Sequence, residues 1–129
     1  MAKLKKEKPR NAGTMSEAAF WAWMRSMLRN KSRHWKPLTQ AKVLVRRKYT
    51  GTNPRLKWEY QCKVCKLYFE EKNIDVDHIV PAGSLNSSDD LKGFVDRLFC
   101  EVVGLQVLCK DCHYDKSMLD KVNNKKQKG

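Results

Sequence analysis

The sequence predicts an α+β fold in which a basic, mainly helical N-terminal extension precedes a compact mixed domain. Apolar residues between residues 16 and 30 recur at helical spacing. From Trp58 onward this pattern gives way to short runs rich in β-branched and aromatic residues, and two C-x-x-C pairs flank that second half. A chain of 129 residues suffices for one domain of modest core size with an arm. We therefore expect three segments: 1–57, 58–122 and a flexible basic tail at 123–129.

The net charge of +13 is concentrated in the first half of the chain. Residues 1–60 carry 16 of the 27 Lys and Arg residues and only three acidic residues, whereas the remainder is neutral overall. Such an excess indicates a polyanionic partner, most commonly nucleic acid, with a merely soluble basic surface as the alternative. No apolar stretch is long enough to cross a membrane, and no apolar signal region follows the basic N-terminus. We therefore expect an intracellular protein without a membrane partner.

The extension is predicted to contain a basic arm and two helices. Residues 1–13 are rich in lysine and nearly free of apolar residues, which is typical of a flexible arm that follows phosphates or of a solubilising tail. Thr14 or Ser16 can cap a helix that runs to about Asn30. Arg25 and Arg29 lie one turn apart, away from its apolar side, and are candidate nucleic-acid contacts. The apolar stripe, which we interpret as core, comprises Phe20, Trp23, Met24, Met27 and Leu28.

The second predicted helix runs from Thr39 to about Tyr49 and is ended by Gly51 and Pro54. It carries the dense basic cluster Arg46-Arg47-Lys48. This cluster is either a DNA contact or a solvated face.

The second half alternates strand and helix signals. Trp58–Phe69 is predicted to form a β-hairpin whose turn carries two thiols, and Asn73–Val80 is predicted to form a strand. After a loop rich in Gly, Ser and Asn at 81–88, the apolar spacing predicts a helix from Asp89 to about Phe99. A short strand at Leu105–Leu108 and a helix from Lys110 to about Val122 follow.

Four of the five cysteines form two pairs, Cys62-x-x-Cys65 and Cys109-x-x-Cys112. In an intracellular chain such pairs favour metal binding over disulfides. Two residues between thiols let both sulfurs of a turn reach one ion, and two pairs supply the closed tetrahedral thiolate set of structural zinc. Four unrelated buried cysteines or a redox role are the alternatives. The fifth, Cys100, follows an apolar helix and is expected to be buried as a small apolar residue.

A carboxylate and two imidazoles lie between and beside the thiols. Asp77 and His78 are neighbours near a predicted strand end, and His113 directly follows Cys112. Carboxylate and imidazole ligands suit an open divalent-ion site, and an imidazole suits a general base near neutral pH. Because neighbours on a strand point to opposite faces, the strand must end or twist at Asp77-His78. A structural role for either histidine is the alternative.

These motifs in combination resemble the HNH endonuclease family in its four-cysteine zinc variant. The resemblance covers about residues 58–120 and rests on the first C-x-x-C pair, on Asp77-His78-Ile79-Val80-Pro81, and on Gly104-Leu105-Gln106-Val107-Leu108-Cys109-x-x-Cys112-His113-x-x-Lys116. It implies a ββα-metal core with strands at about 74–80 and 104–109 and a helix at about 110–120. Chains of this size with a basic N-terminal half are similar to free-standing HNH proteins of tailed phages, which implies the cytoplasm of a bacterial host.

The resemblance also implies roles for individual residues. Asp77 and His113 would hold one catalytic divalent ion (Mg²⁺, Mn²⁺, Ni²⁺ or Zn²⁺), His78 would be the general base, and Lys116 would contact phosphate. Gly104 occupies the position of the family's middle Asn, which braces the loop that carries the base. Asn86 or the backbone could substitute for that brace.

The resemblance thus implies hydrolysis of DNA phosphodiester bonds to 5′-phosphate and 3′-hydroxyl ends, by a monomer that nicks one strand or by paired copies that cut both. A non-catalytic zinc DNA-binding module is the first alternative. An interaction protein built on a decayed nuclease fold is the second.

Overall fold

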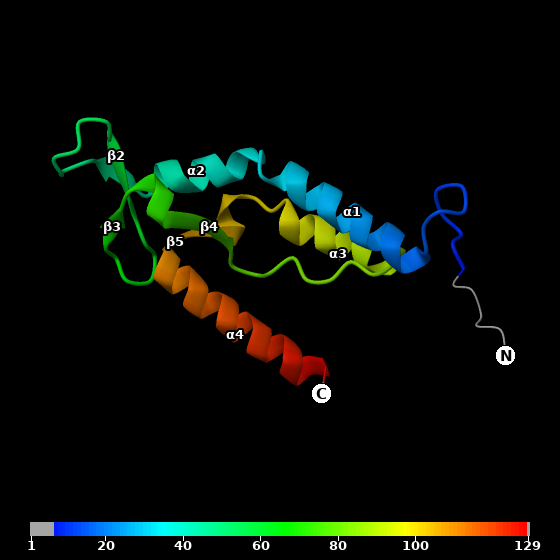
Figure 1. Cartoon of the computed structure of the whole chain (residues 1–129). Coiled ribbons are helices and arrows are strands. Elements are labelled where there is room, and N and C mark those ends of the chain that lie inside the picture. Colours follow the sequence, from blue (N-terminus) through cyan, green and yellow to red (C-terminus); the bar gives the residue numbers. More distant parts are fainter. Residues whose placement is uncertain (1–6, 129) are drawn as a thin grey trace. The chain divides into compact units, whose positions relative to one another are not determined.

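The chain folds into two compact units, each built from two separate stretches of sequence. Unit 1 combines the residues through His34 with Ala82–Phe99, and unit 2 combines Trp35–Pro81 with the residues from Cys100 onward. The computed structural model describes residues 7–128 (Figure 1). Both units contain helices, and unit 2 contains two small antiparallel sheets, so the predicted α+β class is confirmed.

Unit 1 consists of helices α1 (Glu17–Ser32) and α3 (Ser88–Leu98), which pack against each other (Figure 1). The hydroxyl of Ser16 caps α1, as predicted, by accepting a hydrogen bond from the main-chain N–H of Ala19 at 3.1 Å. Part of the predicted stripe packs in the core, whereas Trp23 and Met27 are exposed. The buried core residues are Trp21, Ala82, Leu85, Phe94 and Leu98.

The segment before α1 is anchored to that helix. Main-chain hydrogen bonds of 3.1 Å link Arg10 and Met15 in both directions. The Arg10 guanidinium binds the Glu17 carboxylate at 2.7 Å and lies 4.2 Å from the centre of the Phe20 ring. The predicted flexible arm is therefore held in place from Arg10 onward, while residues 1–6 lie outside the described residues.

Unit 2 begins with α2 (Lys36–Leu44), followed by the sheet β1 (Arg46–Lys48), β2 (Trp58–Gln61) and β3 (Tyr68–Phe69). The predicted helix over Thr39–Tyr49 is wrong in its second half, because Arg46–Lys48 pairs as a strand with β2. Arg47 donates to the buried Glu59 carboxylate at 2.6 Å, a long-range contact that overrides the local helical pattern. The predicted hairpin at Trp58–Phe69 is confirmed.

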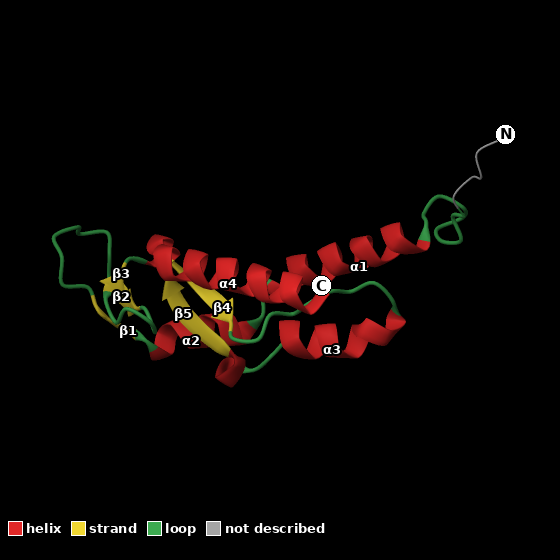
Figure 2. Cartoon of the chain, turned by 90° about the horizontal axis from the view of Figure 1, so that it is seen from below, coloured by secondary structure: helices red, strands yellow, loops and turns green. Residues whose placement is uncertain are grey.

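The second sheet of unit 2 pairs β4 (Ile74–His78) with β5 (Leu105–Cys109), so that Ile74 lies opposite Cys109 and His78 opposite Leu105. Short 3-10 turns at Glu71–Asn73 and Val102–Gly104 precede the two strands. Helix α4 (Lys110–Lys128) begins directly after β5 and includes most of the predicted flexible tail (Figure 2).

Strand alternation divides the two faces of β4 between two helices. Ile74 and Val76 pack in a core cluster with Ala41 of α2, whereas Asp75 and Asp77 bind side chains of α4. One face of the strand is therefore apolar and the other is polar. No helix among the described residues is long and apolar enough to span a membrane.

Candidate metal centre and active site

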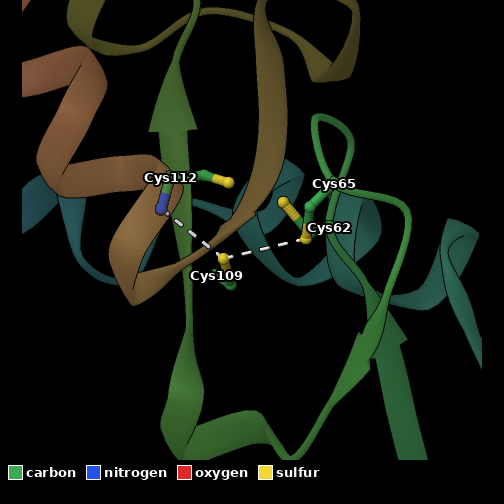
Figure 3. A group of neighbouring side chains, drawn as sticks. All are labelled: Cys62, Cys65, Cys109 and Cys112. Carbon is green, nitrogen blue, oxygen red and sulfur yellow. Dashed lines mark hydrogen bonds between the residues drawn. The ribbon is translucent and has the colours of Figure 1, made fainter.

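The four paired cysteines form one cluster in unit 2, which we call the four-cysteine cluster (Figure 3). Their sulfur atoms all lie within 4.8 Å of one another. Cys62 and Cys65 come from the turn between β2 and β3, and Cys109 and Cys112 come from the junction of β5 and α4. The cluster could therefore hold a structural metal such as zinc, and it would leave no ligand position open for catalysis.

Main-chain hydrogen bonds shape the turn that carries the first two thiols. The N–H of Cys62 donates to the carbonyl of Leu67 at 2.9 Å, and Lys66 turns the chain with a left-handed φ of 67°. The N–H of Lys63 donates to the carbonyl of Val107 at 2.9 Å and so ties the turn to β5. These hydrogen bonds therefore align the turn with the strand that ends at Cys109.

The thiols influence one another's protonation. Burial raises the pKa of Cys62, but main-chain hydrogen bonds from Cys109, Cys65 and Val64 outweigh it and lower this pKa to about 6. The pKa of Cys112 is raised to about 12, mainly because its thiol donates to Cys109 and is partly desolvated beside ionisable sulfurs. Four thiolates cannot coexist at this spacing without a cation, which favours metal binding.

Cys100 lies outside the four-cysteine cluster. It is half-buried against the apolar cluster of unit 2, and burial raises the pKa of its thiol. It therefore packs as a small apolar residue, although it is less buried than the sequence predicted.

Asp77 and His113 face each other across β4 and α4. The side chain of Asp77 is buried, and its Oδ1 lies 3.5 Å from Nε2 of His113. The other carboxylate oxygen, Oδ2, accepts a hydrogen bond from the Gln106 amide at 2.8 Å and lies 3.2 Å from the Lys116 ammonium. One oxygen of Asp77 is thus held by neighbouring side chains while the other is directed toward the imidazole.

The second ring nitrogen of His113 is also held. Its Nδ1 lies 3.1 Å from Oδ2 of Asp75, and the ammonium of Lys110 donates to Oδ1 of Asp75 at 2.7 Å. Burial tends to raise the pKa of Asp75, but the hydrogen bond and charge of Lys110 outweigh it, so this pKa is lowered. An ionised Asp75 favours the tautomer of His113 that carries its proton on Nδ1 and leaves the Nε2 lone pair for a metal.

His78 is the last residue of β4, and the chain bends at Ile79 and Val80. The strand therefore stops short of the predicted end at Val80, and both Asp77 and His78 are still paired across the sheet, with Gln106 and Leu105. The main-chain carbonyl of His78 accepts a hydrogen bond from the Lys116 ammonium at 3.1 Å, and the N–H of Ile79 donates to the carbonyl of Gly104 at 2.9 Å.

Lys116, predicted to contact phosphate, is instead directed into the protein. Its ammonium also binds Asp120 at 2.8 Å, and its side chain is only 20% exposed. Burial tends to lower the pKa of Lys116, but the hydrogen bonds and charges of Asp120 and Asp77 outweigh it, so this pKa is raised and the ammonium stays charged.

The predicted basic contacts lie in both units. Arg25 and Arg29 are exposed on α1 in unit 1, with the Arg29 guanidinium 5.9 Å from the centre of the Phe94 ring. In unit 2, Arg46 lies over Trp58 at 4.0 Å and Arg47 over Tyr68 at 3.5 Å. Lys48 is exposed at the end of β1. A role in DNA contact remains a prediction for all five.

The site contains three further residues that the sequence motifs do not identify: Asp75, Gln106 and Lys110. Alternation along the strand is a signal for Asp75, because it lies two residues before Asp77 and so shares its face. The strand register is the signal for Gln106, since it pairs with Asp77 across the sheet.

Comparison with known proteins gave no match to this chain among protein-family models, curated proteins or solved structures.

Replacing one thiol of the four-cysteine cluster should remove the metal. A Cys109→Ser variant is expected to lose bound zinc and to unfold the β5–α4 junction, because one buried hydroxyl cannot replace a thiolate ligand. Elemental analysis of the purified protein measures the zinc content. The matched control is Cys100→Ser, which should keep one zinc per chain; a fully folded, zinc-loaded Cys109→Ser protein would refute the cluster as a metal site.

Metal uptake should release protons. At pH 7 Cys62 is mostly thiolate, whereas the raised pKa values of Cys65 and Cys112 keep both thiols protonated. Zinc binding to the metal-free protein should therefore release at least two protons. Calorimetry in buffers of different ionisation enthalpy measures this number, and release of fewer than two would contradict coordination by all four sulfurs.

Proposed function

We propose that this protein is a metal-dependent DNA endonuclease of the HNH type, in which the four-cysteine cluster holds structural zinc. The observation that carries the proposal is the pairing of Oδ1 of Asp77 with Nε2 of His113, 3.5 Å apart. In this proposal β4, β5 and α4 form the ββα-metal core. The zinc would hold the first turn of α4, and therefore His113, against β4.

The donor set fits a divalent ion. Two ligands of one ion, each about 2.1 Å from it and at a tetrahedral angle, lie roughly 3.4 Å apart, close to the observed separation. Carboxylate and imidazole together suit Mg²⁺, Mn²⁺, Ni²⁺ or Zn²⁺, and two protein ligands leave coordination positions for water and phosphate. When bound, the ion supplies positive charge beside the phosphate, where negative charge grows in the transition state.

The surrounding side chains support this assignment by orienting the two ligands. Asp75 holds Nδ1 of His113, and Gln106 and Lys116 hold Oδ2 of Asp77. In metal sites, a ligand histidine typically donates its other ring N–H to a carboxylate, and a ligand carboxylate typically accepts further hydrogen bonds.

His78 is proposed to act as the general base. Its imidazole takes a proton from a water molecule, and the water oxygen forms a bond to phosphorus in line with the 3′-oxygen. The bond between phosphorus and the 3′-oxygen breaks, and that oxygen leaves with the electron pair and is protonated by solvent. The products are a 5′-phosphate and a 3′-hydroxyl. Basic residues of the N-terminal half are proposed to bind the DNA backbone, so affinity should fall steeply with salt.

The decisive experiment is cleavage of supercoiled plasmid by the full chain with Mg²⁺, Mn²⁺, Ni²⁺ or EDTA. We expect nicking with at least one of these ions and none with EDTA. The rate at which His78→Ala nicks the plasmid should be lower than that of the wild type by a factor of about 100 or more, because general base catalysis contributes roughly 10²–10⁴-fold. DNA binding by this variant should be unchanged.

The matched control is His34→Ala, since His34 is the histidine that has no proposed role in the site. It should cut like the wild type. Equal cutting by His78→Ala would remove His78 from the role of base. DNA binding without cutting under every ion would favour the non-catalytic zinc module instead.

A further inference from the structure

We propose that Lys116 is a positioning residue for His78. Its ammonium binds the carbonyl oxygen of the peptide group between His78 and Ile79 and so holds that peptide group in place, a contact that we call the clamp. Gly104 has no side chain that could hold this loop instead. The inference deepens the proposed function and rests on it for the role of His78. The clamp itself is a feature of the fold that can be measured without cleavage.

The Lys116 ammonium lies among three oxygens. It is 2.8 Å from Oδ2 of Asp120, 3.1 Å from the main-chain carbonyl oxygen of His78 and 3.2 Å from Oδ2 of Asp77. An ammonium has three N–H donors, and these three acceptors match them in number. Since the side chain is only 20% exposed, the ammonium is committed to the protein rather than to a DNA phosphate.

Both polar groups of the peptide between His78 and Ile79 are held. Lys116 binds the carbonyl oxygen from α4, and the carbonyl of Gly104 accepts from the N–H on the other side. A peptide group is planar, so fixing both its oxygen and its N–H fixes the orientation of the plane. The plane begins at the Cα of His78 and therefore restricts the direction in which the imidazole leaves the backbone.

Gly104 contributes its main chain to this clamp, and the space beside it is filled. A Cβ added at Gly104 would lie 2.9 Å from Sγ and 3.1 Å from Cβ of Cys100. Cys100 is itself held, because its carbonyl accepts a hydrogen bond from the indole N–H of Trp35 at 2.7 Å. An asparagine side chain therefore does not fit at position 104 without displacement of Cys100. The peptide group after His78 is held instead by the main chain of Gly104 and by the Lys116 ammonium. Asn86, the other candidate brace, belongs to unit 1, where its N–H donates to Asp90 at 2.9 Å.

The test uses Lys116→Met in the zinc-loaded full chain, because methionine keeps the apolar stem and removes the ammonium. The matched control is Lys121→Met, an exposed lysine on the same helix. Three quantities are measured: the single-turnover nicking rate at saturating protein, the DNA dissociation constant as a function of salt, and hydrogen exchange of the Ile79 amide without a catalytic ion.

For Lys116→Met we expect the nicking rate to fall by a factor of about 10 to 100, as for a misplaced catalytic group. The dissociation constant and its salt slope should stay unchanged, and the Ile79 amide should exchange roughly tenfold faster because the peptide is released. Lys121→Met should leave the nicking rate and the exchange unchanged. If Lys116→Met does not fold, Asp120→Asn loosens the same ammonium and should raise the Ile79 exchange by a smaller factor.

Two results would overturn the proposal. The first is weaker DNA binding by Lys116→Met, with the slope of log binding constant against log salt concentration reduced in magnitude by about one, which would make Lys116 a phosphate contact. An unchanged Ile79 exchange rate would mean that no clamp exists, whatever happens to cleavage. If the wild type cuts no DNA, the proposed function fails, and the Ile79 exchange still decides the clamp.

Discussion

The four-cysteine cluster is the constraint on which the rest of unit 2 depends. Its sulfurs join the turn after β2 to the junction of β5 and α4, two segments far apart in sequence but within 4.8 Å at their thiols. A metal at this point would close a long loop of chain and stabilise the fold by the free energy of its own binding. Because His113 directly follows Cys112, the same constraint sets where the imidazole lies relative to β4.

Two simple periodicities, of the strand and of the helix, determine which side chains of unit 2 meet at the site. Alternation along β4 directs Asp75 and Asp77 toward α4, and helical spacing directs His113 and Lys116 back toward the strand. Each carboxylate then has a cationic partner, Lys110 for Asp75 and Lys116 for Asp77, which compensates for the cost of their partial burial. As a result, Oδ1 of Asp77 and Nε2 of His113 face each other. The other oxygen of Asp77 and the other ring nitrogen of His113 are bound by neighbouring side chains.

The sequence predicted the parts of this arrangement that depend on local pattern. The clustering of the four paired thiols, the helix of Glu17–Ser32 with its Ser16 cap and the presence of a strand at Ile74–His78 all follow from short-range signals. The strand at Arg46–Lys48 did not, because it depends on pairing with Trp58–Tyr60 and on the buried Glu59. The inward direction of Lys116 depends on three acceptors from β4 and α4, which no local pattern contains. That each unit combines two separate stretches of sequence is likewise not contained in any local pattern.

A metal held by the four sulfurs, apart from Asp77 and His113, has a distinct signature in the zinc K-edge X-ray absorption spectrum of the full chain loaded with one equivalent of zinc. We expect four sulfur neighbours at about 2.3 Å. Nitrogen or oxygen neighbours at about 2.0–2.1 Å in place of sulfur would contradict this expectation, because the ion would then lie at the carboxylate and imidazole instead of the four-cysteine cluster.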